Sequence, residues 1–574
     1  MSAKQCYSTQ SHSRVATSPS SVAARLLLGP VLRHVGTTTA TVWVQTSRPA
    51  QVEVLGCRAP TFSVREQHYA LVEINGLEPG SITTYRVHLD EQLAWPPPAS
   101  PWPDSRIRTR RSARESESPV RVVFCSCRRA KPDDPRSAAA MGPDALDLYA
   151  VRMAGMAPRD WPDALLLLGD QVYADDPTPQ TRRWMDSRRD TSVPPGYEVA
   201  DFTEYVHLYV ESWSDPQFRW LVSTVPTAMI FDDHDVRDDW NTSAAWRDQI
   251  TAQPRWPERI RGALASYWVY QHIGNLSPQQ RHVDPTWRAV QDTSGDAWPA
   301  LQEMADAADG DPGPMSWSFR WDIDGVRLVV LDTRSGRRLT EGRRAMLDDD
   351  EFAWAERAIS EDAHQTAHLL IGSSLPWLLA PAIHDVQSAN AAACSRGSAL
   401  GERIRQALDL EHWAAFEDSF RRLATLLRQV AAAPRAPATI SVLSGDVHHS
   451  YVARAEVEGS PVHQLVSSPV HHPVPRYATA ALRVAWWGPL AAAVRSAVRR
   501  LGVADPALSW RLLRRPVFGN AVATLTFSDR SAEVVFERSG PSGQLEPVTR
   551  IELAGLSTTC QRPATTPRQE SDRR

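Results

Sequence analysis

The chain has 574 residues, which exceeds one compact domain and predicts about two to four structural units. Its 63 basic and 67 acidic residues give a net charge of −4, which excludes a globally basic nucleic-acid binder and a protein dominated by an acidic tail. Six cysteines in this length exclude the dense disulfide framework of a small secreted domain. No segment has the roughly 18 to 20 uncharged apolar residues that span a bilayer, and the polar N-terminus lacks a signal-peptide pattern. We therefore expect a cytoplasmic protein without a transmembrane segment.

The N-terminal part is predicted to be a β-sandwich. Residues 1–25 are polar and lack apolar periodicity, which predicts a disordered tail. Short β-branched runs separated by turn residues begin near Leu28, as is typical of strands. After the turn at Pro79 and Gly80, Tyr85 matches the tyrosine corner of fibronectin type III and immunoglobulin-like sandwiches, in which the hydroxyl binds upstream backbone. We expect this sandwich over residues 26–108.

The rest of the chain is predicted to be a layered α/β domain. A charged, serine-rich segment over residues 109–119 predicts a linker. From Val120 onward, apolar strands alternate with amphipathic helices, so we expect an α/β domain over residues 120–540. Other expected elements are helices over residues 201–213 and 411–430, helices and loops beside the site over residues 249–316, and a C-terminal extension over residues 541–574 that is disordered at its end.

Four apolar strands run into side chains that bind metals. The carboxyl ends of strands in α/β sheets meet at one edge, so residues far apart in sequence gather there. Thiolate, phenolate and imidazole suit a transition metal such as iron, whereas an oxygen-rich site suits a hard cation such as calcium. Each motif alone also fits an ordinary turn, a charged loop or a buried thiol, but four buried strands that all end in ionisable groups would cluster uncompensated carboxylates, which favours bound cations. The residues concerned are Cys125 and Cys127, Asp170 and Tyr173, Asp232 to Asp235, and Asp446, His448 and His449.

The motifs SC, GDxxY, DDHD and SGDxH follow one another in the order that resembles the alkaline phosphatase D (PhoD-like) family of the metallophosphoesterases. The resemblance covers about Leu28 to Glu537. It implies a four-layered α/β/β/α sandwich preceded by the all-β sandwich domain. It also implies metal-dependent hydrolysis of a phosphoric mono- or diester by a metal-bridging hydroxide. The alternative is a non-catalytic, metal-stabilised protein that binds its partner through the β-sandwich.

The same resemblance implies roles for single residues. The catalytic pair would be His234, which faces the phosphoryl group, and Asp235, which orients it. The metals would be Fe(III) and Ca²⁺, with Tyr173 on the ferric ion, and other divalent metals are alternatives. Which metal Asp446 binds and which His448 binds stays open. The implied metal ligands are Cys127, Asp170, Tyr173, Asp233, Asp446 and His448.

Several further residues have two interpretations, and in each case we expect the structural one. Arg128 and Arg129 would form salt bridges with nearby acids rather than hold phosphate. The basic residues 481–515 would form a helical flap whose arginines pair with acids, rather than a surface for membranes or nucleic acid, so no stable nucleic-acid complex is expected. Three histidines would be hydrogen-bonded rather than bound to metal, namely His449, His471 and His472.

Overall fold

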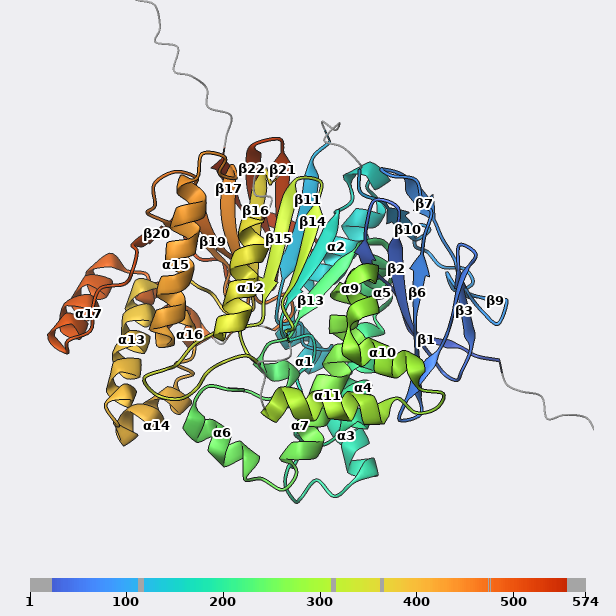
Figure 1. The fold of residues 1–574 in the computed structure, drawn as a ribbon, viewed down its shortest axis with the longest axis horizontal. Helices are drawn as coiled ribbons and strands as arrows, with labels where there is room; N and C mark the ends of the chain where they lie inside the picture. Colours follow the sequence, from blue (N-terminus) through green and yellow to red (C-terminus); the bar gives the residue numbers. More distant parts are fainter. Residues whose placement is uncertain are drawn as a thin grey trace, which may run out of the picture.

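The computed structural model describes residues 23–111, 118–310, 316–361, 366–472, 474 and 476–554. Most of the predicted N-terminal tail, the centre of the predicted linker and the end of the C-terminal extension lie outside the described residues. Figure 1 shows a strand domain, in blue, beside a larger body in which central sheets are flanked by helices. No helix in the described part of the chain is long and apolar enough to cross a membrane.

The N-terminal domain is an all-β sandwich, as predicted. One sheet has the order β1-β2-β6-β5 and the other β4-β3-β8-β9, and β10 pairs with β7 beside them. The faces that meet are lined by valine, leucine and isoleucine side chains. The strands are β1 (Leu26–Val35), β2 (Ala40–Thr46), β3 (Gln51–Val54), β4 (Cys57–Pro60), β5 (Phe62–Val64), β6 (Gln67–Ile74), β7 (Ile82–Thr84), β8 (Val87–Leu89), β9 (Gln92–Trp95) and β10 (Arg106–Arg108).

The first sheet of this sandwich is buried on both faces. Successive side chains of a strand point to opposite faces, and in β2 the side chains of Val42 and Val44 enter the sandwich core. Trp43, between them, belongs to the core of the larger domain. Its ring lies 6.2 Å from that of Trp213 and 5.3 Å from that of Tyr270. The sandwich is therefore fixed to the larger domain by an aromatic interface.

Tyr85 corrects one detail of the predicted sandwich. Its hydroxyl donates a 2.5 Å hydrogen bond to the carbonyl of Ser223, in α5 (Pro216–Thr224) of the larger domain. The expected bond to upstream backbone of the sandwich is therefore wrong. The last carbonyl groups of a helix accept no hydrogen bond from within the helix. One such carbonyl near the end of α5 accepts the hydrogen bond from Tyr85 across the domain interface.

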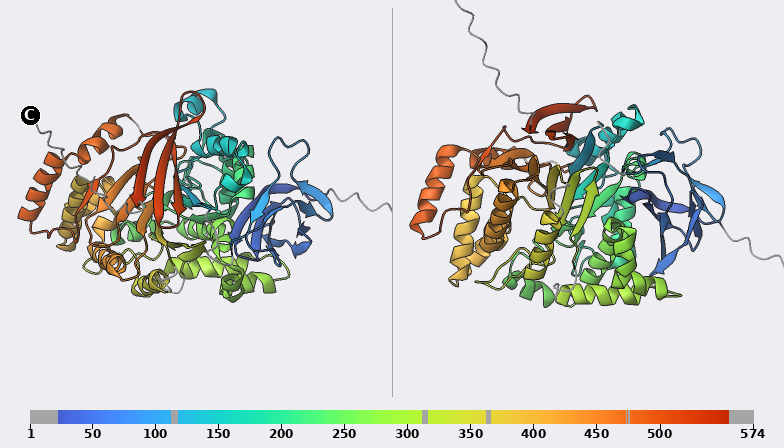
Figure 2. Two further views of the ribbon diagram at one scale, coloured as in Figure 1. Left: turned by 90° about the horizontal axis from the view of Figure 1, so that it is seen from above. Right: turned by 45° about the horizontal axis from the view of Figure 1, so that its top comes forward.

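The larger domain has two sheets. The six-stranded sheet has the order β13-β12-β11-β21-β22-β23, in which β11, β12 and β13 are parallel. The seven-stranded sheet has the order β14-β15-β16-β17-β19-β18-β20. Figure 2 shows the C-terminal strands, in red, and of these β21 pairs with β11. The strands are β11 (Val120–Cys125), β12 (Ala164–Leu168), β13 (Thr227–Ile230), β14 (Phe319–Ile323), β15 (Val326–Leu331), β16 (His368–Ser373), β17 (Thr439–Ser444), β18 (Tyr451–Ala455), β19 (Val462–Val466), β20 (Trp510–Leu512), β21 (Ala521–Ser528), β22 (Ser531–Ser539) and β23 (Leu545–Ala554).

Alternation along β15 shows the layering. Leu328 and Val330 belong to the core between the two sheets, whereas Val329 and Leu331 belong to the core beneath α12 and α15. On the far side, α2 packs on the six-stranded sheet. The predicted α/β/β/α sandwich is thus confirmed. The helices are α1 (Pro135–Met141), α2 (Ala145–Ala154), α3 (Pro179–Arg188), α4 (Phe202–Trp213), α6 (Ala244–Thr251), α7 (Trp256–Tyr267), α8 (Ile273–Asn275), α9 (Pro278–Val283), α10 (Pro285–Asp292), α11 (Trp298–Gly310), α12 (Asp349–Ser360), α13 (Pro381–Ser395), α14 (Ala399–Ala407), α15 (Glu417–Ala432), α16 (Arg476–Ala485) and α17 (Gly488–Arg500).

The predicted helices are found, with one corrected boundary. The helix expected from residue 201 is α4, which Asp201 caps by accepting a hydrogen bond from the backbone of Glu204. The helix expected from residue 411 begins only at Glu417, after a short 3-10 turn. Residue 411 is held elsewhere, because the Glu411 carboxylate forms a buried salt bridge with Arg337. Apolar periodicity thus extends further than the helix itself.

Candidate metal centre

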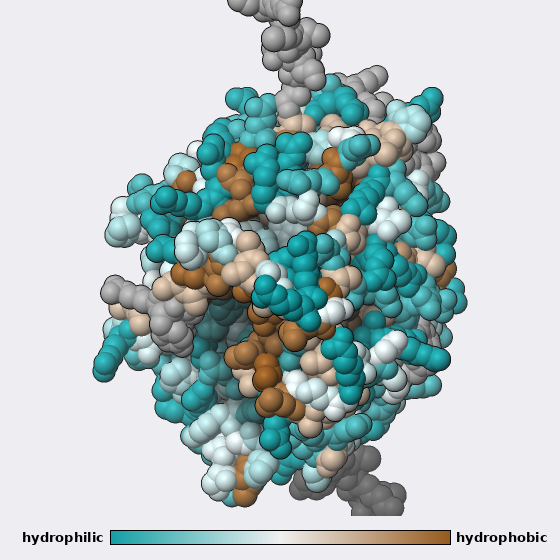
Figure 3. All heavy atoms as spheres, turned by 90° about the vertical axis from the view of Figure 1, so that its left-hand side faces the viewer, coloured by the Kyte–Doolittle hydropathy of each residue, from teal (hydrophilic) through white to brown (hydrophobic). Residues whose placement is uncertain are grey.

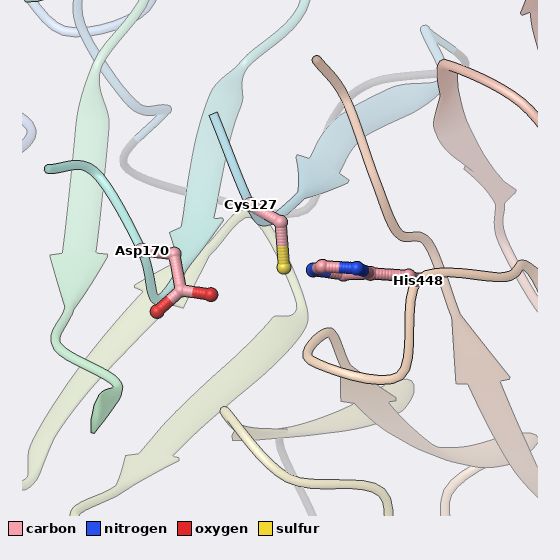
Figure 4. A group of neighbouring side chains, drawn as sticks. All are labelled: Cys127, Asp170 and His448. Carbon is pink, nitrogen blue, oxygen red and sulfur yellow. The ribbon is translucent and has the colours of Figure 1, made fainter. Parts of the chain in front are cut away.

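The strand ends meet where the sequence places metal-binding residues. Cys127 follows β11, Asp170 follows β12, and His448 follows β17 of the facing sheet. Figure 4 shows the Cys127 sulfur, the Asp170 carboxylate and the His448 ring pointing into one space. One ligand atom from each of these three residues lies within 4.8 Å of the others. We call this set the thiolate group.

A second set lies beside the first. Asp232, Asp233 and Asp446 also offer carboxylate oxygens within 4.8 Å of one another, and we call this set the carboxylate group. A third cluster of Asp170, Asp233 and His234 shares one residue with each of the two groups and so links them. Five of the six predicted ligands are thereby gathered at one place.

Tyr173, the sixth predicted ligand, lies at the same place. Its ring is 4.6 Å from that of His234, and its hydroxyl is 3.0 Å from Nδ1 of His472. Burial, together with the neighbouring charges of Asp170 and Cys127, raises the pKa of the Tyr173 hydroxyl well above its ordinary value. Without a bound cation this phenol stays protonated.

The backbone of the site is held in an unfavourable conformation. Four of the predicted ligands have left-handed backbone angles, a conformation that costs a residue other than glycine about 1 to 3 kcal/mol. Such conformations persist only where the surrounding structure enforces them, and they cluster at functional sites. The φ angles are 58° at Cys127, 54° at Asp170, 64° at Asp446 and 50° at His448.

Two glycines permit the close approach of the strand ends. A Cβ atom at Gly445 would lie 2.1 Å from Oγ of Ser126 and 2.9 Å from the carbonyl oxygen of Leu168. A Cβ atom at Gly169, where φ is +94°, would lie 2.4 Å from Cβ of Asp232. The glycines of the GD and SGD motifs therefore allow ligands from different strands to meet.

The residues present fit bound cations. One carboxylate oxygen each of Asp170, Asp232 and Asp233 is buried without a hydrogen-bond partner in the described part of the chain. Burial and neighbouring carboxylates raise the pKa of Asp170 well above its ordinary value, and burial with the Asp170 charge does the same for the Cys127 thiol. Burial lowers the pKa of His448 to about 4, so its imidazole is neutral and able to bind a metal at pH 7. Cations would satisfy the unpaired oxygens and stabilise the deprotonated ligands.

Arg334 is a component that the site prediction missed. Its fully buried guanidinium contacts Asp232, lies 3.3 Å from Asp233, and forms a 2.6 Å ion pair with Glu411. A carboxylate oxygen of Asp446 is 3.8 Å away. The carboxylate group thus contains a positive charge from the chain itself. The sequence contains a signal for this residue. The apolar strand β15 is followed by Asp332 and Arg334, just as the four other strands are followed by their predicted ligands.

His234 is oriented by a different carboxylate from the one predicted. Nδ1 of His234 lies 2.9 Å from a carboxylate oxygen of Asp175, not of Asp235. Asp235 instead accepts hydrogen bonds from the backbone N–H groups of Asp170 (2.9 Å) and Asp232 (2.9 Å), and so holds two ligand loops together. The predicted orienting role of Asp235 is therefore wrong: the carboxylate that binds His234 comes from the loop after Tyr173, and the Asp235 carboxylate is occupied by backbone N–H groups. Asp175 lies two residues after Tyr173 and could have been considered from that position.

The two arginines and three histidines that have two interpretations make structural contacts, as expected. Arg128 is 1% exposed and forms 2.8 Å salt bridges with Asp144 and Asp215, while Arg129 pairs with Asp176 at 2.7 Å. Both arginines are therefore engaged with acids, as expected. The three remaining histidines are hydrogen-bonded through Nδ1, as expected: His449 with the carbonyl of Val447, His471 with that of Arg129, and His472 with the hydroxyl of Tyr173.

The basic segment 481–515 forms parts of α16 and all of α17. Arg495 pairs with Asp385 at 2.6 Å, and Arg499 pairs with Asp505 at 2.7 Å. The expectation that arginines of this helical segment pair with acids is confirmed for these two residues.

The site opens into a cavity of about 340 Å³. Members of both ligand groups reach its surface, and residues of α13, of α16 and of the segment directly after α14 form other parts of its lining. The acidic and histidine side chains that line it are Asp170, Asp233, His234, Asp238, Asp409, Glu411, His412, Asp446, His448 and His449.

Comparisons with known proteins agree with this architecture. Residues 147–511 match the family described as PhoD-like phosphatase, and residues 23–107 match a domain of unknown function (DUF7800). A solved structure titled "Structure of PhoD" shares 12% sequence identity with a TM-score of 0.58, over 92% of this chain and 90% of that chain, which shows a common fold. A purple acid phosphatase, PPD1, from yellow lupin (Lupinus luteus) seeds shares 11% identity with a TM-score of 0.47, over 91% of this chain and 74% of that chain. No curated protein matches the chain in sequence.

Proposed function

The chain belongs to the PhoD-like phosphatase family, whose match spans more than half of it, and from this premise we propose that it hydrolyses phosphoric esters with two or more bound cations. The observation that supports this most strongly is the overlap of the ligand clusters around buried oxygens that have no hydrogen-bond partner in the described residues. Family membership makes the chain a phosphatase, which leaves the alternative of a non-catalytic binding protein without support.

The donor atoms favour two unlike cations. Cys127, Asp170 and Tyr173 would hold Fe(III), because thiolate and phenolate are ligands of transition metals. The carboxylate group would hold a hard cation such as Ca²⁺, because its donors are oxygens. His448 and Asp446 would each serve one of the two. When bound, the cations supply an activated water at neutral pH and neutralise charge on the phosphoryl oxygens.

His234 would provide the proton for the leaving group. Burial lowers its pKa, but the hydrogen bond and charge of Asp175 and the charge of Asp233 outweigh burial and raise the pKa of His234 well above its ordinary value. Because Nδ1 is held by Asp175, Nε2 remains to donate toward the cavity that His234 lines. As water attacks phosphorus in line and the bond to the leaving oxygen breaks, Nε2 would protonate that oxygen.

Other side chains would hold the ligands in place. Nε2 of His412 lies 2.8 Å from a carboxylate oxygen of Asp446. Burial raises the pKa of Asp446, but His412 and the charge of Arg334 outweigh burial and keep the pKa below its ordinary value. Oγ of Ser468 donates to the Cys127 sulfur at 3.2 Å. Contacts of this kind fix the orientation of metal ligands.

Parallel assays with 4-nitrophenyl phosphate and bis(4-nitrophenyl) phosphate, with and without chelator, test the proposal and separate monoester from diester cleavage. We expect a chelator to abolish hydrolysis and added cations to restore it. Activity that persists after elemental analysis has shown the metals to be gone would contradict the proposal.

The assignment of Tyr173 to ferric iron has its own test. Tyrosinate bound to Fe(III) gives a visible charge-transfer absorption, which we expect in the wild-type protein and not in Tyr173→Phe. A colourless active protein that contains only calcium would contradict this assignment.

A further inference from the structure

Two unlike kinds of side chain line the cavity beside the metal centre. Some are polar, namely members of the ligand groups and the carboxylates of Asp238 and Asp409. Others are aliphatic and come from four separate segments, and we call them the apolar wall. Its members are Leu379, Ile383, Leu408, Val447 and Leu482.

The apolar wall contains side chains that the chain itself leaves uncovered. Leu408, directly after α14, is 61% exposed, and Ile383 in α13 and Leu482 in α16 are partly exposed. Figure 3 shows apolar surface beside a hollow on the face of the molecule to which α13, α14 and α17 belong. Exposed apolar side chains that gather in a cavity, rather than singly on the surface, mark a binding site.

The segment that carries Leu482 is anchored. Trp486, at the end of α16, packs edge-on against Tyr451 with 5.0 Å between ring centroids. Tyr451 lies in β18 and its hydroxyl donates a 2.7 Å hydrogen bond to the carbonyl of Leu378, the residue before Leu379. Two parts of the apolar wall are thus tied to one strand of the seven-stranded sheet.

The charges around the cavity limit what accompanies the phosphoryl group. No arginine or lysine lines the cavity among the described residues. A substrate with additional phosphates, such as a nucleoside polyphosphate, would find no guanidinium or ammonium group among the described residues that line this cavity. The carboxylates of Asp238 and Asp409 at the same cavity further disfavour a second negative charge. Its volume of about 340 Å³ lies in the range of roughly 300 to 1,000 Å³ typical of small organic ligands.

We propose that the substrate is a phosphoric ester with an uncharged, apolar organic group, which lies against Ile383, Leu408 and Leu482 while the phosphoryl group lies at the ligand groups. This assignment rests on the proposed function. An alkyl or aryl group would cover the exposed side chains of the apolar wall, and its burial would supply affinity that the phosphoryl group alone does not.

Calorimetric titration of the metal-loaded full chain with ethylphosphonate and with hexylphosphonate, whose P–C bond is not a phosphoric ester, tests the inference without turnover. We expect hexylphosphonate to bind roughly tenfold to a hundredfold more tightly, because the longer chain reaches the apolar wall. Leu408→Ser and Leu482→Ser should each reduce this preference severalfold through weaker binding of hexylphosphonate. The matched control is Leu501→Ser, since Leu501 is also 61% exposed but does not line the cavity.

Two results would overturn the inference: equal affinity for the two phosphonates, or a preference that Leu408→Ser and Leu482→Ser affect no more than Leu501→Ser does. Hydrolysis of the nitrophenyl esters is measured on the same preparations. Metal-dependent hydrolysis without a preference for hexylphosphonate would retain the proposed function and refute the apolar group. A preference without hydrolysis of either ester would refute the proposed function and retain the apolar wall as a binding site.

Discussion

The thiolate group and the carboxylate group are built from similar strand ends but balance their charge differently. In the carboxylate group, the buried guanidinium of Arg334 lies among the acids and pairs with Asp232 and Asp233. In the thiolate group, Asp170 and Cys127 are buried together, and the opposing positive charge on Asp170 is that of His234. The carboxylate group therefore already contains a buried guanidinium that belongs to the chain, whereas the thiolate group is expected to depend more on cations taken from solution.

The largest effect is expected from Asp170→Asn. This substitution removes a ligand that the thiolate group shares with the cluster around His234. We expect kcat/KM to fall by roughly a thousandfold or more, together with loss of bound metal. Steady-state kinetics and elemental analysis of the same preparation provide the check. Near wild-type activity in Asp170→Asn would place the reaction elsewhere.

Arg334→Met tests the charge balance of the carboxylate group. Removing one partner of a buried ion pair leaves the acids uncompensated and costs about 3 to 5 kcal/mol in the free energy of unfolding. Arg58→Met is the control, because Arg58 forms an exposed pair with Glu53 and its loss should change that free energy by no more than about 1 kcal/mol. Urea unfolding of both variants measures the difference. Equal stabilities would show that Arg334 does not compensate the carboxylate group.

His234→Ala tests the proton donor that lies between the two groups. We expect kcat to fall by about a hundredfold while the metal content is retained. Asp175→Asn should lower kcat less. Because Asp175 raises the pKa of His234, its loss should also move the decline of kcat with rising pH to a lower pH. Full activity in His234→Ala, or an unchanged pH profile in Asp175→Asn, would remove this pair from the mechanism.

A histidine outside both groups, His384, is buried beside the positive charge of Arg495. Burial lowers the pKa of His384 to about 3, and its ring packs against Phe420 and Trp510. The unfolded chain therefore binds a proton below about pH 6.5 that the folded chain does not, so stability is lost as the pH falls from 6.5 toward 3, by at most about 1.4 kcal/mol per pH unit.

The free energy of unfolding of His384→Phe, measured relative to that of wild type, should therefore be higher at pH 5 than at pH 8. Urea unfolding at the two pH values measures this change. A stability difference that is the same at both pH values would contradict the assignment of this pH dependence to His384.

The residues that converge at the candidate metal centre could be predicted from the sequence because their signal is local. An apolar strand, a glycine and then a carboxylate or histidine, as at Asp170 and Asp446, is visible in a short segment. The layered fold was predictable for the same reason, since the alternation of strands and helices is local. The contacts between the motifs were not predictable in this way, because they depend on how segments from two sheets pack.

Three errors or omissions share this origin. Tyr85 finds its acceptor in another domain, at Ser223. His234 is held by Asp175 from the neighbouring loop rather than by the next residue in its own motif. Arg334 contacts acids from three other segments, so its role depends on packing that no single motif reveals.

Catalysis is expected to require cations that the thiolate group binds. Metal-depleted wild-type chain and metal-depleted Asp170→Asn are reloaded with iron and calcium, and the bound cations per chain are counted while hydrolysis of the nitrophenyl esters is followed. We predict that the wild type binds at least two cations and regains activity, whereas Asp170→Asn binds at least one fewer and stays inactive. A variant that regains both the wild-type metal content and the wild-type activity would contradict the claim.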